Sequence, residues 1–156
     1  MGVEELTSVL EQAGARYELL PHAHAESALA EAAALGVAPA EVAKTLVVKT
    51  PSGHVRAVLP ASERIDFKKL AELLGETRKS VQLASEDELR VGYPEFELGA
   101  VPPLGGAHRD TVVVDSRVGE HESIVLEAGS HDESIRLTTS DLLRLTGARV
   151  AEICVD

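Results

Sequence analysis

Apolar positions along this 156-residue chain follow two rhythms, one with the period of a helix and one with that of a strand. Spacings of three and four residues, as in Leu6, Val9 and Leu10, predict a helix that Gly14 closes. Similar patterns, with Ser27, Asp66 and Ser85 as N-caps, predict further helices. The predicted helices cover residues 3–13, 27–35, 66–75, 85–90 and 140–147.

Short runs of branched apolar residues predict the strands. These cover residues 16–22, 45–48, 55–60, 111–115, 123–129, 134–138 and 148–155, and the turn at 51–53 makes a hairpin of the second and third. One helical turn is expected over residues 39–44, immediately before that hairpin. The irregular order of helices and strands predicts a single compact α+β domain over residues 1–156, with a mixed, largely antiparallel sheet and flanking helices.

Composition narrows the class of protein. Cys154 is the single cysteine, which excludes an internal disulfide and favours the cytoplasm. The first residues are acidic where a signal peptide is basic, and no apolar run approaches the ~20 residues of a membrane helix. We therefore expect a cytoplasmic protein with no membrane partner.

Charge is unevenly distributed along the chain. The formal net charge is −11, which argues against DNA or other extended nucleic acid as a partner. Residues 44–79 carry eight basic and four acidic side chains, so this segment is +4 and the remainder −15. Such a segment suits either local contact with a phosphate chain or simple exposure to solvent.

Lys44 and Thr45 stand where the chain enters the first strand of the hairpin. A lysine at that place either extends its long stem to solvent or holds a cation at the rim of a cavity. In the second case the ammonium faces a phosphate or a developing oxyanion. The sequence alone leaves both interpretations open.

Two further segments carry candidate chemistry. Residues 99–106, Gly-Ala-Val-Pro-Pro-Leu-Gly-Gly, form either a structural connection or a rigid wall whose backbone N–H groups face a substrate carbonyl.

Ser130, His131 and Asp132 are adjacent, and adjacent side chains diverge, so they do not make a catalytic triad. His131 remains a candidate positioning group. Scattered histidines and one cysteine predict no metal site and no cofactor.

Several of these segments together resemble one known family. The segments are Glu41–Val48 (EVAKTLVV), Ala57–Ala61 (AVLPA), Asp66–Leu70, Gly92-Tyr93 and the GAVPPLG of residues 99–105. In this order they are similar to the YbaK/prolyl-tRNA-synthetase-associated domain family of aminoacyl-tRNA editing deacylases. The resemblance extends over nearly the whole chain.

The resemblance implies an enzyme that hydrolyses the ester of a mischarged tRNA, acting free-standing on a small amino acid and without a cofactor. It assigns catalytic roles to Lys44, Thr45, Gly99 and His131. It assigns substrate binding to Tyr17, Pro102, Pro103, Gly105, Gly129, Ser130, Asp132 and Ser134. Relatives closer to cysteinyl-tRNA deacylases have an aspartate where this chain has Ser134, which weakens the expectation of a cysteinyl substrate.

The expected partners are the aminoacylated acceptor end of a tRNA and a prolyl-tRNA synthetase. A hydrolytic second sieve is needed because a synthetase pocket separates side chains differing by one methylene by only ~1–3 kcal/mol. The alternative is a non-catalytic module of the same fold that binds tRNA or a synthetase. A general small-ester hydrolase fits less well, because no G-x-S-x-G motif is present.

Overall fold

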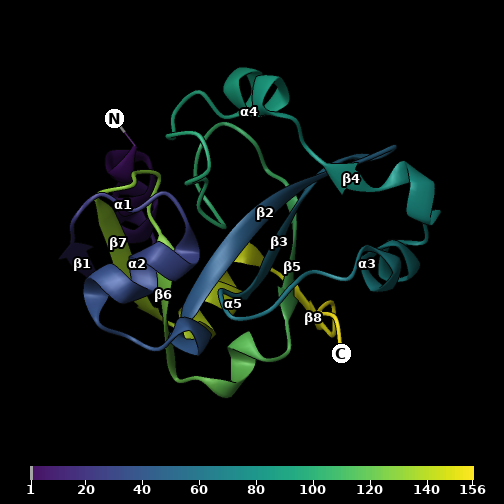
Figure 1. Cartoon of the computed structure of the whole chain (residues 1–156). Coiled ribbons are helices and arrows are strands. Elements are labelled where there is room, and N and C mark those ends of the chain that lie inside the picture. The colour runs from purple at the N-terminus through teal and green to yellow at the C-terminus, as the bar shows by residue number, and fades with distance from the viewer. Residues whose placement is uncertain (1) are drawn as a thin grey trace.

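The computed structural model describes residues 2–156, which form one eight-stranded sheet with helices on both faces (Figure 1). The α-helices are α1 (Val3–Gln12), α2 (Ala28–Leu35), α3 (Phe67–Leu74), α4 (Glu86–Gly92) and α5 (Thr139–Thr146), and the short 3-10 turns are η1 (Pro39–Glu41), η2 (Arg78–Ser80) and η3 (Val118–Glu120). The strands are β1 (Tyr17–Pro21), β2 (Val42–Thr50), β3 (Gly53–Pro60), β4 (Gln82–Leu83), β5 (Thr111–Asp115), β6 (Ser123–Glu127), β7 (Glu133–Thr138) and β8 (Arg149–Ala151). Within the described residues, no helix is long and apolar enough to cross a bilayer.

The strand order is β1-β7-β6-β2-β3-β5-β8, with β4 added beside β2. The long β2–β3 hairpin is the centre, and β1–β7, β6–β7 and β2–β4 are also antiparallel. The contacts β2–β6, β3–β5 and β5–β8 are parallel and shorter. This arrangement confirms the predicted α+β fold with a mixed, largely antiparallel sheet.

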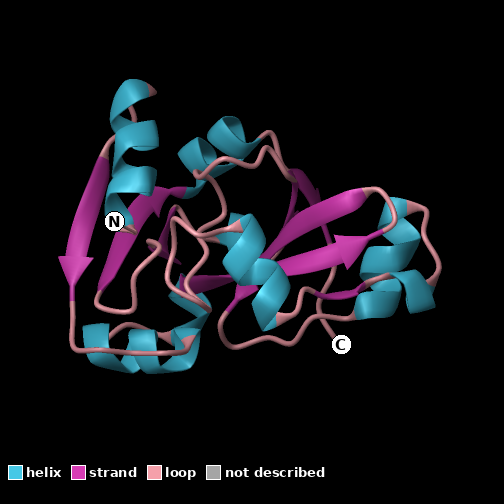
Figure 2. Ribbon diagram, turned by 90° about the horizontal axis from the view of Figure 1, so that it is seen from above, coloured by secondary structure: helices cyan, strands magenta, loops and turns pink. Residues whose placement is uncertain are grey.

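The helices cover the two faces of the sheet, and Figure 2 shows α1 and α2 on opposite sides of it. On one face, Leu6 and Leu10 of α1 pack with Leu142 of α5 in the largest hydrophobic cluster. On the other face, α2 packs Ala28 and Ala32 against the sheet, and α3 packs a separate cluster further along. Helices α2 and α3 therefore lie on the same face of the sheet, each against its own cluster.

Local sequence explains the helix ends. The Ser27 hydroxyl accepts a hydrogen bond from the Ala30 N–H, and Asp66 accepts from the N–H groups of residues 68 and 69. Gly36 ends α2 in the left-handed region at φ 68°, a conformation open to glycine without a Cβ penalty. These predicted caps are confirmed.

The boundary at Lys44 differs from the prediction. Helical geometry ends at Glu41, and β2 begins at Val42 because the next residues already pair with both β3 and β6. Lys44 is therefore the third residue of a strand and not the end of a turn. The predicted strand at 148–155 is also shorter, since the Asp115 carboxylate accepts the Ile153 N–H and draws the chain out of the ladder.

A buried arginine fixes the glycine- and proline-rich loop. Arg56 is 1% exposed, and its guanidinium donates to the carbonyls of Pro102 and Gly105 at 2.9 Å each and to Asp110 at 2.9 Å. The Tyr93 hydroxyl donates to the same aspartate at 2.6 Å. Arg56, one of the eight basic side chains of residues 44–79, is thus an internal anchor and does not contribute to a basic surface.

Candidate functional site

The site forms where two parallel strands stop pairing. Strands β2 and β6 are matched only at Val42 with Val125 and at Ala43 with Leu126. The next residue on each strand is Lys44 and Glu127. Val42 and Val125 pack under α2, and side chains two residues apart share a face, so Lys44 and Glu127 project on the α2 face.

A narrow cavity lies beside this break. Its volume of about 10 Å³ is room for roughly one water molecule. The lining residues come from the segment after β1, from α2, from the 97–105 loop and from the β6–β7 turn. They are His22, Ala25, Glu26, Ser27, Glu31, Gly99, Ala100, Glu127, Ser130 and His131.

Two glutamates form the floor of this cavity. Glu31 of α2 is 3% exposed, and Ser134 of β7 donates its hydroxyl hydrogen to Glu31 Oε2. Ser134 pairs with Glu127 across β6 and β7, so both lie on the α2 face. Glu31 Oε1 and Glu127 Oε2 are both buried without a hydrogen-bond partner. The cavity therefore has an acidic floor with free acceptor atoms.

Electrostatics in the cavity follow from burial. Burial raises the pKa of Glu127 well above its ordinary value; the charge of Glu31 raises it further, and the charge of Lys44 opposes the shift. Burial likewise raises the pKa of Glu31, against the hydrogen bond from Ser134. The pKa of Lys44 is lowered by burial, and the charge of Glu127 partly offsets this. The site thus couples one half-buried cation to one buried and one partly buried acid.

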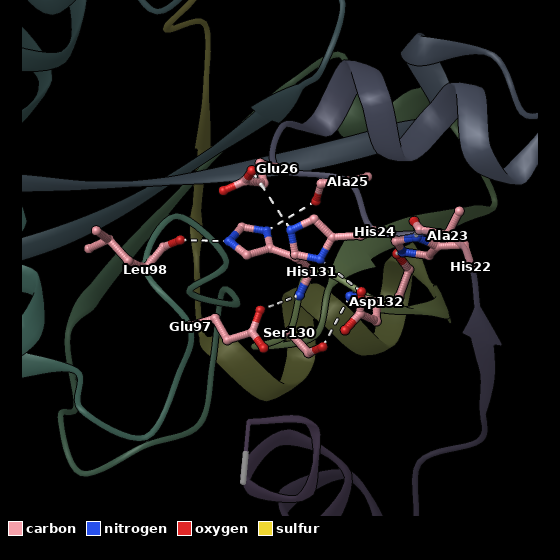
Figure 3. A network of polar contacts seen from close by, with 11 residues as sticks. His22, Ala23, His24, Ala25, Glu26, Glu97, Leu98, Ser130, His131 and Asp132 are labelled. Atoms are coloured by element: carbon pink, nitrogen blue, oxygen red, sulfur yellow. Dashed lines mark hydrogen bonds and ion pairs between the residues drawn. The ribbon is translucent and has the colours of Figure 1, made fainter.

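The imidazole of His131 joins the two walls of the cavity (Figure 3). Its Nε2 lies 2.7 Å from the Leu98 carbonyl oxygen and its Nδ1 3.1 Å from the Ala25 carbonyl oxygen. Its backbone N–H donates to Glu97 at 2.8 Å. His131 therefore connects the 97–105 loop to the segment before α2.

Gly99 places backbone directly at the cavity. Its φ is +84°, and a Cβ at this position would lie 3.6 Å from the His131 ring. The Gly99 N–H donates no hydrogen bond to any residue in the described range 2–156. A free amide on a cavity wall is a ready donor for a carbonyl oxygen or an oxyanion.

The structure brings together four of the sequence-predicted residues. Gly99, Ser130 and His131 line the cavity, and Lys44 lies at the strand break beside it. Ser134 lies beneath the floor, where it is fully buried and supports Glu31. These positions agree with a role at one common site.

Thr45 and Tyr17 project away from the cavity. Thr45 follows Lys44 in an extended strand, so its side chain points to the opposite face, where its hydroxyl is buried without a partner. Tyr17 packs at the edge of the α1 cluster and donates its hydroxyl hydrogen to Glu11 at 2.7 Å. The residue that β1 delivers to the cavity is instead His22, just beyond the strand end.

Five other predicted residues occupy structural positions outside the cavity lining. The carbonyls of Pro102 and Gly105 bind Arg56, and Pro103 lies beside them facing α1 and α5. A Cβ at Gly129 would meet Phe96 at 2.6 Å, so Gly129 permits close packing. Asp132 lies outside the cavity and contacts His24 Nδ1 at 2.9 Å.

The site lacks an activated protein nucleophile. His22 Nε2 lies 2.9 Å from the Ser134 hydroxyl, but that hydroxyl donates to Glu31 and is fully buried. No acid orients the His22 ring, because its Nδ1 faces the Ala23 carbonyl. Burial raises the pKa of the Cys154 thiol to about 12, which keeps it protonated. Among residues 2–156, no group of three or more His, Cys, Asp or Glu side chains is arranged to hold a metal ion.

Sequence reasoning missed Glu31, Glu127 and His22. Glu31 stands among alanines in α2, and Glu127 ends an apolar strand. The one signal in the sequence is a charged residue at a position where the apolar pattern expects a buried side chain. Glu31 stands next to the buried Ala32 in α2. Glu127 lies two residues after Val125, so in a strand it projects on the same face as that valine. Their convergence depends on the β2–β6 contact, which no local pattern specifies.

The chain is similar in sequence and in fold to known tRNA-editing proteins. A model of the aminoacyl-tRNA editing domain matches residues 22–145. The chain is 30% identical over 147 residues to the multifunctional Ser/Thr-tRNA deacylase ProXp-y of Escherichia coli K12, covering 91% of this chain and 86% of that protein. It is also 30% identical over 133 residues to EbsC of Enterococcus faecalis, a proposed Cys-tRNA(Pro)/Cys-tRNA(Cys) deacylase, covering 85% and 77%. The crystal structure of a proposed trans-editing enzyme for prolyl-tRNA synthetase superposes with a TM-score of 0.87 at 25% identity, covering 99% and 98%.

Proposed function

Because the chain belongs to the aminoacyl-tRNA editing domain family, we propose that it hydrolyses the ester linking a wrong, small amino acid to a tRNA. One observation carries the assignment to this site: Lys44 lies at the break between β2 and β6, beside a cavity walled by the Gly99 backbone. The deacylase names of two relatives support the reaction, and their serine, threonine and cysteine substrates support a small acyl group.

Ester hydrolysis requires a water molecule, a fixed acyl group and a place for negative charge. Water oxygen bonds to the acyl carbon, the ester C–O bond breaks, and the proton released by water ends on the ribose oxygen. No protein nucleophile takes part, in keeping with the protonated thiol of Cys154 and the buried hydroxyl of Ser134. The chain's task is positioning and electrostatic stabilisation.

Lys44 supplies the positive charge in this scheme. Within the described residues its ammonium has neither a hydrogen bond nor an ion pair, so it is available to the terminal phosphate or the oxyanion. The Gly99 N–H is the second donor and faces the carbonyl oxygen. The proton acceptor for the attacking water is a hydroxyl of the substrate's own ribose. Thr45, on the opposite face, takes no part.

The acyl group is larger than the water-sized cavity, so binding requires the wall to move. The 97–105 loop is the mobile wall in this proposal, because the side chain of His131 holds it through the Leu98 carbonyl oxygen. Arg56 anchors the far end of the same loop at Pro102 and Gly105 and keeps that end in place. Opening therefore breaks the contact of the loop with His131, while Arg56 continues to hold its far end.

The tRNA acceptor end meets the basic part of the surface. Lys68, Arg78 and Lys79 are exposed near α3, on the side of the sheet to which Lys44 projects. A prolyl-tRNA synthetase is the proposed source of the mischarged tRNA, which the description of the matching crystal structure supports. The chain acts in trans, on tRNA that a separate synthetase releases.

A panel of mischarged tRNAs tests this proposal. Purified protein is incubated with alanyl-, seryl-, threonyl- and cysteinyl-tRNA, and the released amino acid is measured against buffer. Release of at least one amino acid is expected. Binding of tRNA without release above buffer would instead identify a non-catalytic module, and hydrolysis of simple esters but of no tRNA would identify a general esterase.

A further inference from the structure

Glu31 and Glu127 leave two carboxylate oxygens without partners in one cavity. A buried acceptor without a hydrogen bond is destabilising, and more strongly so when the group is charged. Glu31 is nearly fully buried, and its second oxygen is already satisfied by Ser134. Glu31 Oε1 and Glu127 Oε2 are therefore the buried atoms of the cavity floor that lack a donor.

The missing group must be a small donor, and its charge follows from the surroundings. Two acids on one floor attract a cation, and an ammonium group offers three N–H donors. Lys44 lies beside Glu127 but forms no ion pair with it within the described residues, so the chain's own ammonium leaves the oxygens free. The two other titratable side chains at the floor, His22 and His131, use their ring nitrogens on Ser134 and on backbone oxygens. Within residues 2–156, no side chain donates to these two oxygens.

We infer that Glu31 and Glu127 bind the α-ammonium group of the aminoacyl ester. The inference rests on the proposed deacylase function and deepens it, because it defines which esters the site accepts. The α-ammonium is the one positive group common to all the small amino acids considered above. It is separated from the ester carbonyl by a single carbon, so seating it on the glutamates directs the carbonyl toward Gly99 and Lys44.

This arrangement makes the site selective for a free α-amine. Esters whose nitrogen is acylated, such as formylated or peptidyl tRNA, lose the charge and add bulk at the floor. The site would then spare tRNAs engaged in initiation and elongation while hydrolysing freshly mischarged ones. In the empty site burial raises the pKa of both glutamates, and an entering ammonium group opposes that shift because it favours their ionised forms.

The test compares an amino ester with its isosteric neutral analogue. Alanyl-, seryl- and threonyl-tRNA are each converted by deamination into the 2-hydroxyacyl-tRNA, which replaces the ammonium by a hydroxyl of similar size. For the wild-type protein, we expect kcat/KM to be at least about tenfold higher for the amino ester. In Glu127→Gln that ratio should fall toward one, mostly through loss of activity on the amino ester.

Matched variants keep the result interpretable. Glu122→Gln removes an exposed charge just before β6 and should retain the wild-type ratio. If Glu127→Gln fails to fold, Glu31→Gln replaces it as the variant of the cavity floor. The comparison of the two esters with the wild-type protein does not depend on any variant. Equal wild-type rates on amino and hydroxy esters overturn the inference alone. An equal loss on both esters in Glu127→Gln also overturns it, since it points to a general base. Failure to hydrolyse either ester of any of these three tRNAs, together with failure to hydrolyse cysteinyl-tRNA, overturns the proposed function instead.

Discussion

Lys44 and Glu127 occupy equivalent places on neighbouring parallel strands, one residue beyond the last backbone pair. That pair, Ala43 and Leu126, closes the contact between β2 and β6, and both charged side chains then project on the α2 face. The position combines partial burial with access to a cavity. A charge so placed interacts with its neighbours more strongly than one in open water.

The raised pKa of Glu127 predicts a pH dependence of stability. A folded-state pKa above the ordinary value of 4.5 means that the folded protein holds a proton which the unfolded chain has lost. The stabilisation is complete below that value and is lost as pH rises toward the folded-state pKa. Glu127→Gln should therefore show a smaller fall in the free energy of unfolding between about pH 5 and about pH 8. Urea titrations at both pH values measure it, and an unchanged fall would contradict the assignment.

His131→Ala should loosen the 97–105 loop. The variant removes the ring that contacts the Leu98 and Ala25 carbonyls, and one lost hydrogen bond corresponds to about 1 kcal/mol. Amide exchange within the loop should then accelerate by roughly three- to tenfold while β2 and β3 stay protected. His24→Ala, which removes an exposed neighbouring ring, is the control. Equal exchange in wild type and His131→Ala would show that the contact does not hold the loop.

Gly129→Ala should destabilise the fold. The added Cβ would lie 2.6 Å from Phe96 Cδ1 at a φ of +88°, so both packing and backbone resist it. Overpacking of this kind costs about 1–3 kcal/mol. Gly119→Ala is the matched control, because a Cβ there meets nothing within 4 Å. Unfolding of both variants at the wild-type temperature would show that Gly129 is not needed for packing. The substrate-binding role implied by the family resemblance would then be the better explanation of this glycine.

Local patterns predicted much of the fold for physical reasons. Ser27 and Asp66 cap their helices through their own side chains, and Gly36 ends a helix through its own backbone. Such features need only a few neighbouring residues. The two-residue strand β4 was missed because its pairing with the end of β2 is the only thing that makes it a strand.

The site was only partly predictable for the same reason. Lys44 and Gly99 could be named from short motifs, but Glu31 and Glu127 come from a helix and a strand that meet through long-range pairing. Thr45 was assigned to the site through the family resemblance, together with Lys44, which was expected to end a turn, so strand alternation was not applied to the two residues. Once β2 begins at Val42, alternation alone sends Lys44 and Thr45 to opposite faces.

The rate of deacylation by Lys44→Ala tests the central claim most directly. The measurement is kcat/KM for the mischarged tRNA that the wild type hydrolyses best, with Lys49→Ala, an exposed lysine of the same strand, as control. We predict a loss of about 10²–10³-fold for Lys44→Ala with unchanged thermal unfolding, and little loss for the control. A folded Lys44→Ala protein that deacylates as fast as the wild type would contradict the account.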